Sequence, residues 1–316
     1  MHDKSSSRPI QIQVQIQVQF RFEFKFRPKF KFNFIYLCNM HLRNVHRYGY
    51  DFVKLAEAHP ALESHFTKTP DGATTIDFSK PDSILEFNTA LLKHHYNVRY
   101  WKLPAGSLYP PIPGRADYIH HIADLIGKGE KTGLDIGCGA SAIYPILGNA
   151  IYDYKMVGSD VDENSIAHAK DNTLKNAAIE IRHQQNRSNI LQGIIKDGET
   201  FDFVMCNPPF YASAEEAEKE NLKKQRKLGT VEESRNFAGM SHELWCNGGE
   251  ALFVKRLIKE SADFKEQVGW FTSLLSRKRN LPKLQKLATK LNAEVKVIPM
   301  QTGNKESRIL AWKFGN

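Results

Sequence analysis

The amino-acid sequence predicts a doubly wound α/β domain preceded by a small helical module. Leu134 and Ile136 bracket a short buried strand that ends in a glycine-rich turn. A second strand is predicted at 156–160, about twenty residues further on, and it ends in a carboxylate. Strand and helix patterns continue to alternate after residue 113, which is typical of this class. With 316 residues, 41% of them hydrophobic, the chain can bury one large core and a smaller one.

Residues 1–39 form a low-complexity extension. Polar and apolar residues alternate with period two from Gln11 to Phe26, Pro28 interrupts the alternation, and residues 29–34 resume it. The segment has no turn signal that would fold it into a hairpin. Three interpretations stay open: a disordered tail, an aggregation-prone edge strand, or an artefact of a start site placed upstream of Met40. We expect little of the function to depend on this segment.

Residues 40–112 predict a small N-terminal module and a stiff linker. One amphipathic helix is predicted at 51–59 and another helix at 81–96, with an extended interruption between them; Pro60 and Pro70-Asp71-Gly72 punctuate this stretch. Prolines then restrict the backbone ahead of the main domain, at positions 104, 110, 111 and 113.

Residues 113–316 are predicted to form the main α/β domain. Strands are predicted near 133–137, 156–160, 179–183, 201–206, 250–254 and 268–275, with a closing strand at 307–314. The charged stretch 215–236 lies between two of these strands and predicts a mobile substrate loop.

The formal net charge of +9 is concentrated near the N-terminus. Residues 1–47 hold nine Lys and Arg against two acidic residues, which leaves only +2 for the rest of the chain. The overall charge is therefore weak evidence for a nucleic-acid partner. Two local basic clusters are more specific, and each fits either a solvated helix face or phosphate contacts. They are Lys219, Lys223, Lys224, Arg226 and Lys227, and Arg277, Lys278 and Arg279 with Lys283, Lys286 and Lys290.

Cysteine, histidine and hydropathy patterns exclude several classes of protein. The four cysteines are widely spaced and form no Cys-x-x-Cys pair, so we expect neither a disulfide framework nor a zinc site, and a reducing cytoplasm fits. The twelve histidines show no metal-ligand spacing. No apolar run approaches the roughly 20 residues of a membrane span, and polar residues throughout the first segment exclude a signal peptide.

The turn after the first predicted strand indicates a nucleoside-containing cofactor that lacks phosphates. Gly137 and Gly139 let the backbone approach a ligand closely, and Asp160 ends the next strand, where it can accept from ribose hydroxyls. A dinucleotide fingerprint needs a third glycine, where this chain has Ala142. Asp135 would repel a pyrophosphate, but it suits the sulfonium and ammonium cations of S-adenosylmethionine. We therefore predict S-adenosylmethionine as the cofactor.

Asn207-Pro208-Pro209-Phe210, at the end of the strand predicted at 201–206, indicates a site for a planar amine. The Asn207 side-chain oxygen and the Pro208 carbonyl can accept both protons of an exocyclic amino group. The two prolines stiffen the turn. Phe210 can stack on the base, a contact of roughly 1–3 kcal/mol. The alternative, a proline-capped strand end with an aromatic residue in the core, is disfavoured by the glycine turn upstream. We predict a catalytic role for all four residues.

Five motifs together resemble the bacterial ribosomal RNA large subunit methyltransferase F family, over about Met40 to Phe314. They are Pro110–His121, Gly133–Ser141, Asn207–Phe210, Glu243–Glu250 and Phe271–Arg277. That family methylates N6 of one adenine in 23S ribosomal RNA, and the eukaryotic methyltransferase acting on U6 small nuclear RNA is a more distant relative. The resemblance implies a Rossmann-like class I methyltransferase fold that depends on S-adenosylmethionine, with an N-terminal RNA-binding module. It implies a cytoplasmic enzyme whose partner is 23S ribosomal RNA or a large-subunit assembly intermediate.

The same resemblance implies roles for single residues. Arg115 would hold the cofactor carboxylate, with a linker-to-surface ion pair as the alternative. Gly137 and Ser141 would hold the methionine end, and Asp160 the ribose. Arg43 and Arg47 match a basic segment that contacts RNA in the eukaryotic relative. The full cofactor set is Arg115, Asp135, Gly137, Gly139, Ser141, Asp160 and Asn207. The full RNA-binding set is Arg43, Arg47, Lys223, Lys224, Arg226, Arg277, Lys278 and Arg279.

Two other functions stay open. A protein glutamine N5-methyltransferase would also present an amide NH₂ to an Asn-Pro-Pro-aromatic motif, but such enzymes usually have tyrosine where Phe210 stands, and they lack the basic clusters. The other is a non-catalytic RNA-binding protein with a degenerate pocket. The presence of Asp135, Gly137, Gly139 and Asn207 argues against it. We expect a monomeric rRNA methyltransferase without a metal.

Overall fold

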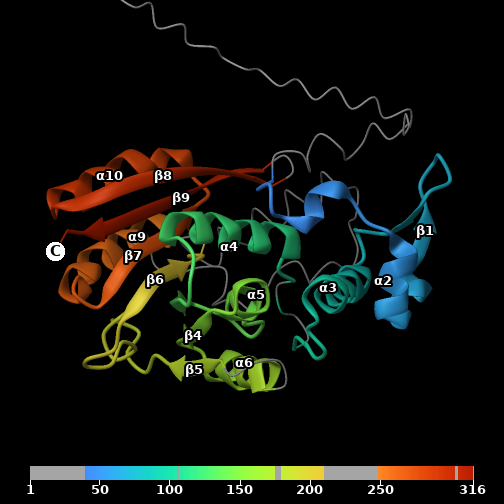
Figure 1. The fold of residues 1–316 in the computed structure, drawn as a ribbon, viewed down its shortest axis with the longest axis horizontal. Coiled ribbons are helices and arrows are strands. Elements are labelled where there is room, and N and C mark those ends of the chain that lie inside the picture. Colours follow the sequence, from blue (N-terminus) through green and yellow to red (C-terminus); the bar gives the residue numbers. More distant parts are fainter. Residues whose placement is uncertain are drawn as a thin grey trace, which may run out of the picture. The chain divides into compact units, whose positions relative to one another are not determined.

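The structure is a computed structural model that describes residues 40–104, 107, 109–174, 179–209, 248–302 and 305–315. All of them belong to one compact unit, Asn33–Asn316. Its centre is a seven-stranded sheet of order β5-β4-β3-β6-β7-β9-β8 (Figure 1). The strands are β3 (Thr132–Ile136), β4 (Lys155–Asp160), β5 (Glu180–His183), β6 (Phe201–Cys206), β7 (Val268–Leu275), β8 (Ala293–Thr302) and β9 (Lys305–Phe314). The predicted Rossmann-like α/β class is confirmed.

The register of the central strands brings their carboxyl ends to one edge. Strand β3 pairs in parallel with β4 on one side and β6 on the other, so that Asp135 lies between Gly158 and Met205. Strand β7 continues the parallel set next to β6, and β9 and β8 close the sheet in antiparallel orientation. The residues that follow β3, β4 and β6 therefore meet at the same edge, which is where ligands bind in open α/β sheets.

Helices cover both faces of the sheet. The helices α4 (Ile112–Ile126), α5 (Ile143–Tyr152) and α6 (Glu163–Leu174) share one hydrophobic core with β-strand residues such as Phe203 and Met205. The helices α9 (Gly249–Glu260) and α10 (Leu281–Lys290) share the other core, which contains Phe271 and Trp312. Neighbouring residues such as Phe203 and Val204 on β6, or Ala311 and Trp312 on β9, serve opposite cores, as the pleat of a strand requires.

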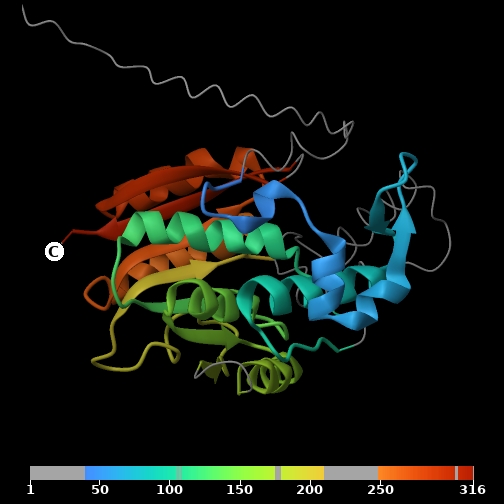
Figure 2. The same ribbon diagram turned by 45° about the vertical axis from the view of Figure 1, so that its right-hand side comes forward.

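The N-terminal module contains α2 (Phe52–Ala58), α3 (Pro81–Tyr96) and a small antiparallel hairpin, β1 (Phe66–Lys68) with β2 (Thr74–Ile76). Figures 1 and 2 show these elements, in blue to teal, at one side of the sheet domain. Both helices were predicted, and the hairpin occupies the predicted extended interruption. Helix α2 begins at Asp51, whose carboxylate accepts from the backbone N–H groups of Val53 and Lys54.

The prediction of a strand at 250–254 is wrong, because this segment lies within helix α9. Its short apolar run, Ala251 to Val254, fits a buried strand or a buried helix equally well by periodicity. The longer pattern decides the matter: Val254, Leu257 and Ile258 are buried at helical spacing, whereas Leu252 is exposed.

Strand β8 was not predicted. It lies at the edge of the sheet, and an edge strand tolerates Pro299, which has no N–H for a neighbouring strand. Its alternation of Glu294 and Lys296 with Val295 and Val297 is the signal that could have identified it.

Candidate active site

A cavity of about 520 Å³ opens at the carboxyl ends of β3, β4 and β6. Six of the seven residues predicted to bind the cofactor line it: Arg115, Gly137, Gly139, Ser141, Asp160 and Asn207. Asp135 is not among the lining residues. In the predicted catalytic motif, Pro209 lines the cavity and Pro208 is buried outside the lining. Phe210 lies outside the described residues.

The turn between β3 and α5 is fastened to the end of β4. The N–H groups of Gly137 and Cys138 both donate to the Ser159 carbonyl, at 2.8 and 2.9 Å. Gly158 makes this close approach possible, because a Cβ atom there would lie 3.1 Å from Cys138 Sγ and 2.9 Å from the Ile181 side chain. Gly137 has φ 75°, in the region that favours glycine. The turn thus presents bare backbone to the cavity.

Asp160 holds its carboxylate at the cavity through backbone donors. One oxygen accepts from Gly139 N at 2.9 Å, and the other from Val161 N at 2.7 Å and Asp162 N at 3.0 Å. Burial raises the pKa of this carboxyl, and the backbone hydrogen bonds oppose that rise. Each carboxylate oxygen has two lone pairs, so the group can accept further hydroxyl donors from a ligand.

Arg115 connects α4 with two other elements of the site. Its Nη1 donates to the Tyr144 hydroxyl at 2.7 Å, and its guanidinium lies 5.3 Å from the centre of the Tyr144 ring. In the amide orientation that satisfies both groups, the Asn207 oxygen accepts from Nη1 at 3.1 Å and Nη2 at 3.3 Å. Arg115 Nε is buried and has no hydrogen-bond partner among the described residues. One donor of this arginine is therefore left for an anion.

Asp135 lies in the protein interior near Arg115 instead of on the cavity wall. Its side chain is 1% exposed, and neither carboxyl oxygen has a hydrogen-bond partner among the described residues. Burial raises the pKa of Asp135 to about 8, although the charge of Arg115 lowers it. The residue predicted to face the cofactor cations is thus a buried carboxyl that lies near the charges of Arg115, which lowers its pKa, and of Asp160, which raises it.

The predicted basic residues near the N-terminus differ in their surroundings. Arg43 donates to Asp124 at 2.7 Å, to the Tyr152 hydroxyl at 2.8 Å and to the His120 carbonyl at 3.1 Å. These contacts attach the N-terminal segment to α4 and α5. The guanidinium of Arg47 lies 5.5 Å from the ring centre of Tyr48, whose side chain is 73% exposed. An RNA contact for either arginine stays a prediction.

Glu250 is the last residue of the motif Glu243–Glu250, and no role was predicted for it from the sequence. It is 2% exposed and accepts from Ser276 N at 2.6 Å, Ser276 Oγ at 2.5 Å and Asn280 Nδ2 at 2.8 Å. The segment that it holds, after β7, contains the predicted RNA-binding residues Arg277, Lys278 and Arg279, of which the last two are exposed. One buried carboxylate at the start of α9 therefore shapes the basic segment.

The other predicted substrate residues, Lys223, Lys224 and Arg226 within the stretch 215–236, lie outside the described residues.

The segment 184–199, which lies between β5 and β6, also belongs to the site and was not predicted from the sequence. Its residues Gln184, Arg187, Asn189 and Ile190 line the cavity. Glu260, at the end of α9, accepts from the N–H groups of three consecutive residues of this segment, Ile190 to Gln192, at 2.8–3.0 Å. Arg256 on the same helix donates to the Ser188 carbonyl at 2.6 Å. Helix α9 thus fixes the part of the segment that faces the cavity.

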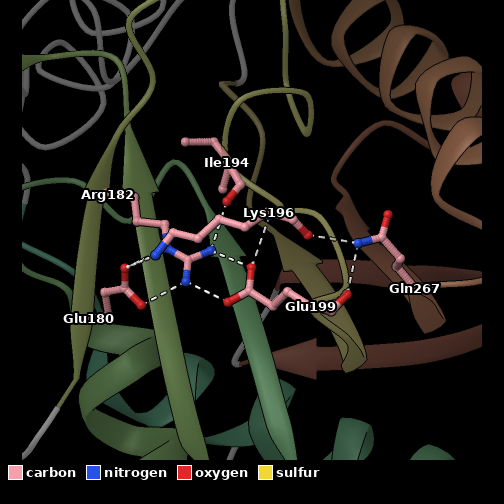
Figure 3. Close-up of polar contacts among 6 residues, drawn as sticks. All are labelled: Glu180, Arg182, Ile194, Lys196, Glu199 and Gln267. Carbon is pink, nitrogen blue, oxygen red and sulfur yellow. Dashed lines mark hydrogen bonds and ion pairs between the residues drawn. The ribbon is translucent and has the colours of Figure 1, made fainter.

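A buried arginine closes the far end of this segment (Figure 3). The Arg182 side chain is 8% exposed and donates to both oxygens of Glu180 and both oxygens of Glu199, at 2.6–2.8 Å. It also donates to the Ile194 carbonyl at 2.7 Å. Its hydrogen bonds lower the pKa of Glu180 to about 2. Arg182 forms a bidentate ion pair with each of the two glutamates, and such pairs fix the relative orientation of the side chains in addition to balancing their charges.

The described residues contain neither a cluster of metal ligands nor a helix that could span a membrane. No group of three or more His, Cys, Asp or Glu residues among them is arranged to hold a metal ion. Among the helices that the structure describes, none has the length and hydropathy that crossing a membrane requires.

The sequence is similar to a family described as RNA methyltransferase, whose model matches residues 36–316. It is 52% identical to the ribosomal RNA large subunit methyltransferase F of Christiangramia forsetii over 284 residues, which covers 87% of this chain and 100% of the relative. The protein of the same name from Saccharophagus degradans is 45% identical and covers 87% of this chain and 95% of its own length.

Solved structures with similar folds include those of human METTL16. Its catalytic domain in complex with MAT2A 3′UTR hairpin 1 has a TM-score of 0.77 at 29% identity, covering 88% of this chain and 96% of the other. Its N-terminal domain in complex with SAH has a TM-score of 0.69 at 26% identity, covering 88% and 99%.

The buried carboxyl of Asp135 predicts a pH dependence of stability. Its pKa is about 8 in the folded protein against 3.8 ordinarily, so the folded state binds the proton more tightly than the unfolded chain. Its contribution to stability is therefore fully present below about pH 4 and is lost as the pH rises toward 8. The slope reaches at most about 1.4 kcal/mol per pH unit.

We expect Asp135→Asn to remove this decline, because the amide does not ionise. Chemical unfolding of the unliganded protein at pH 5, 6, 7 and 8 measures it. The free energies of unfolding of wild type and variant should diverge in favour of the variant as the pH rises. A constant difference across this range would contradict the assignment.

Proposed function

The chain belongs to the RNA methyltransferase family whose model matches residues 36–316, and we propose that it methylates the N6 amino group of one adenine in 23S ribosomal RNA. The methyl donor of this family is S-adenosylmethionine, and a related structure contains SAH. The observation that carries the proposal is the shared cavity, in which the end of β6 meets the glycine turn of β3. Relatives named ribosomal RNA large subunit methyltransferase F support rRNA as the substrate. The proposal includes a cytoplasmic location, where rRNA is found, and a monomeric enzyme that uses no metal.

The residues of the cavity fit the cofactor. Arg115 has a buried Nε without a partner among the described residues, which suits the cofactor carboxylate. Asp160 keeps acceptor capacity for ribose hydroxyls, and the bare backbone around Gly137 and Ser141 leaves room for the methionine end. When bound, S-adenosylmethionine supplies an electrophilic methyl group on a sulfonium.

The end of β6 holds the other reactant. The Asn207 oxygen and the Pro208 carbonyl would accept the two N–H protons of adenine N6, which directs its lone pair toward the methyl group. The cofactor would supply the methyl group with cleavage of its C–S bond, and the amino nitrogen, once bonded to that methyl group, would release one proton to solvent. Orientation of this kind can lower the barrier by roughly 7–11 kcal/mol. The adenine must first leave its stack, with Phe210 as its stacking partner.

Arg115 links the two halves of the site. Without a ligand, its guanidinium donates to the Asn207 oxygen, the same atom that the adenine amino group needs. A carboxylate bound at Arg115 is a stronger acceptor than the Asn207 amide, because it carries a charge opposite to that of the guanidinium and can accept two parallel hydrogen bonds from it. The cofactor would therefore draw Arg115 away and leave the amide oxygen of Asn207 for the substrate.

We expect Asn207→Ala to reduce methyl transfer by about 10²- to 10³-fold, comparable to the loss of one preorganised hydrogen-bonding group in other enzymes. SAH affinity should change by no more than a few-fold, because the other cofactor contacts remain. Radiolabelled transfer to rRNA and calorimetry with SAH measure the two quantities. The control is Asn149→Ala, which removes a side-chain amide near the C-terminal end of α5, at a residue that does not line the cavity. This variant should behave as wild type. Near-normal transfer by Asn207→Ala would refute the proposed role.

Glu250 and Glu260 form a matched pair for separating RNA from cofactor binding. Glu250 holds the basic segment after β7, and Glu260 holds the cavity-lining turn at 190–192. We expect Glu250→Gln to raise the apparent KM for rRNA several-fold with unchanged SAH affinity. We expect Glu260→Gln to weaken SAH binding several-fold with an unchanged KM for rRNA. Steady-state kinetics and calorimetry measure both. If Glu250→Gln weakened only SAH binding, the proposed RNA role of Arg277, Lys278 and Arg279 would be wrong.

The substrate class is tested by digesting the radiolabelled product formed in a cell extract. We expect ribonuclease, and not protease, to release the label, since the basic segment at 277–279 suits phosphates. Label released only by protease would favour glutamine methylation. Mapping methylated adenines in rRNA from cells with and without the gene then identifies the nucleotide. Unchanged rRNA methylation would contradict the 23S assignment.

A further inference from the structure

We propose that Trp101 and Asn172 are positioning residues for the cofactor, because they hold two consecutive carbonyl groups of the glycine turn from outside it. The Trp101 indole N–H donates to the Ser141 carbonyl at 3.0 Å. The Asn172 amide donates to the Ala140 carbonyl, also at 3.0 Å. Trp101 belongs to the segment between α3 and α4, and Asn172 to α6, so neither residue is part of the motifs that predicted the site.

The two residues act together with the backbone of Lys102. The Asn172 oxygen accepts from Lys102 N at 2.8 Å, and its amide donates to Lys102 O at 2.8 Å. The Asn172 side chain thus satisfies both backbone groups of Lys102, as the backbone of a neighbouring strand would do. The same amide also donates to the glycine turn. Trp101 is 5% exposed and Asn172 is 1% exposed, so their hydrogen bonds are shielded from water. Trp101 and Lys102 lie in the part of the chain that was predicted to be the N-terminal module and linker. This part therefore supports the glycine turn of the sheet domain.

The turn needs such support because its backbone is strained. Gly139 has φ 59°, and Ala142, which has a Cβ, has φ 44°. A non-glycine residue in this region costs about 1–2 kcal/mol and persists only where its surroundings enforce it.

Fixing these carbonyl groups also fixes the donors that face the cavity. In a trans peptide the C=O and the next N–H point in opposite directions. With the Ala140 carbonyl held by Asn172, the Ser141 N–H points to the opposite side, and Ser141 lines the cavity. The hydrogen bond from Asn172 therefore sets the direction of the Ser141 N–H, which an anionic group of the cofactor would use, and the hydrogen bond from Trp101 fixes the next peptide group, whose Ala142 N–H donates to the Gly139 carbonyl at 3.4 Å.

Trp101→Phe tests the inference, because it keeps an aromatic ring in the core and removes the N–H donor. We expect the full-length variant to bind SAH about five- to tenfold more weakly in calorimetry, comparable to the loss of one net hydrogen bond. The matched control is Trp312→Phe. Trp312 is also buried, and its N–H donates to Ser261 Oγ at 2.9 Å in the other core. This control should lower the Tm to a similar extent and leave SAH affinity within twofold of wild type.

Asn172→Ala is the second variant, and it decides the question if Trp101→Phe does not fold. We expect it to weaken SAH binding by a similar factor. Wild-type SAH affinity in Asn172→Ala and in any folded Trp101→Phe would overturn the proposal, and so would an equal loss in Trp312→Phe. The measurement requires no RNA, so its result is independent of whether adenine in 23S rRNA is the substrate.

Discussion

The parallel pairing of β3 with both β4 and β6 is the constraint on which the rest of the site depends. It places three strand ends at one edge, so that a glycine turn, the Asp160 carboxylate and the Asn207 amide line one cavity. Each of these groups is then fixed by local hydrogen bonds, from backbone N–H groups in the case of Asp160 and from Arg115 in the case of Asn207. The sheet supplies proximity, and the side chains at its edge supply direction.

The surroundings of the cavity favour function over stability. Asp135 is a buried carboxyl without a hydrogen-bond partner among the described residues, and Ala142 has a backbone conformation that disfavours a side chain. Such features cost free energy in the unliganded protein and are typical of sites prepared for a ligand. The cost is met by the two hydrophobic cores and by hydrogen bonds at the periphery, where Trp101 and Asn172 support the turn, and Arg182 and Glu260 support the neighbouring segment.

Sequence patterns predicted the parts of the site that are local in the chain. Asp160 and Asn207 each follow an apolar run, and the glycines of the turn after β3 are recognisable by spacing alone. The role of Glu250 was not predictable, because its partners at 276–280 are distant in sequence and a buried carboxylate has no local signature. The same holds for Asn172, whose helix pattern gives no indication of the turn that it contacts. The strand predicted at 250–254 failed because four apolar residues in a row do not distinguish a strand from a helix.

A crystal structure with SAH and an adenosine-containing oligonucleotide tests the central claim most directly. The distance to measure is from adenine N6 to the SAH sulfur that carried the methyl group, together with the distances from N6 to the Asn207 oxygen and the Pro208 carbonyl. We expect both acceptors within hydrogen-bond distance of N6, about 2.7–3.2 Å, with the sulfur directly ahead of the nitrogen. A complex in which SAH occupies the cavity while the adenine lies away from the end of β6 would contradict the claim.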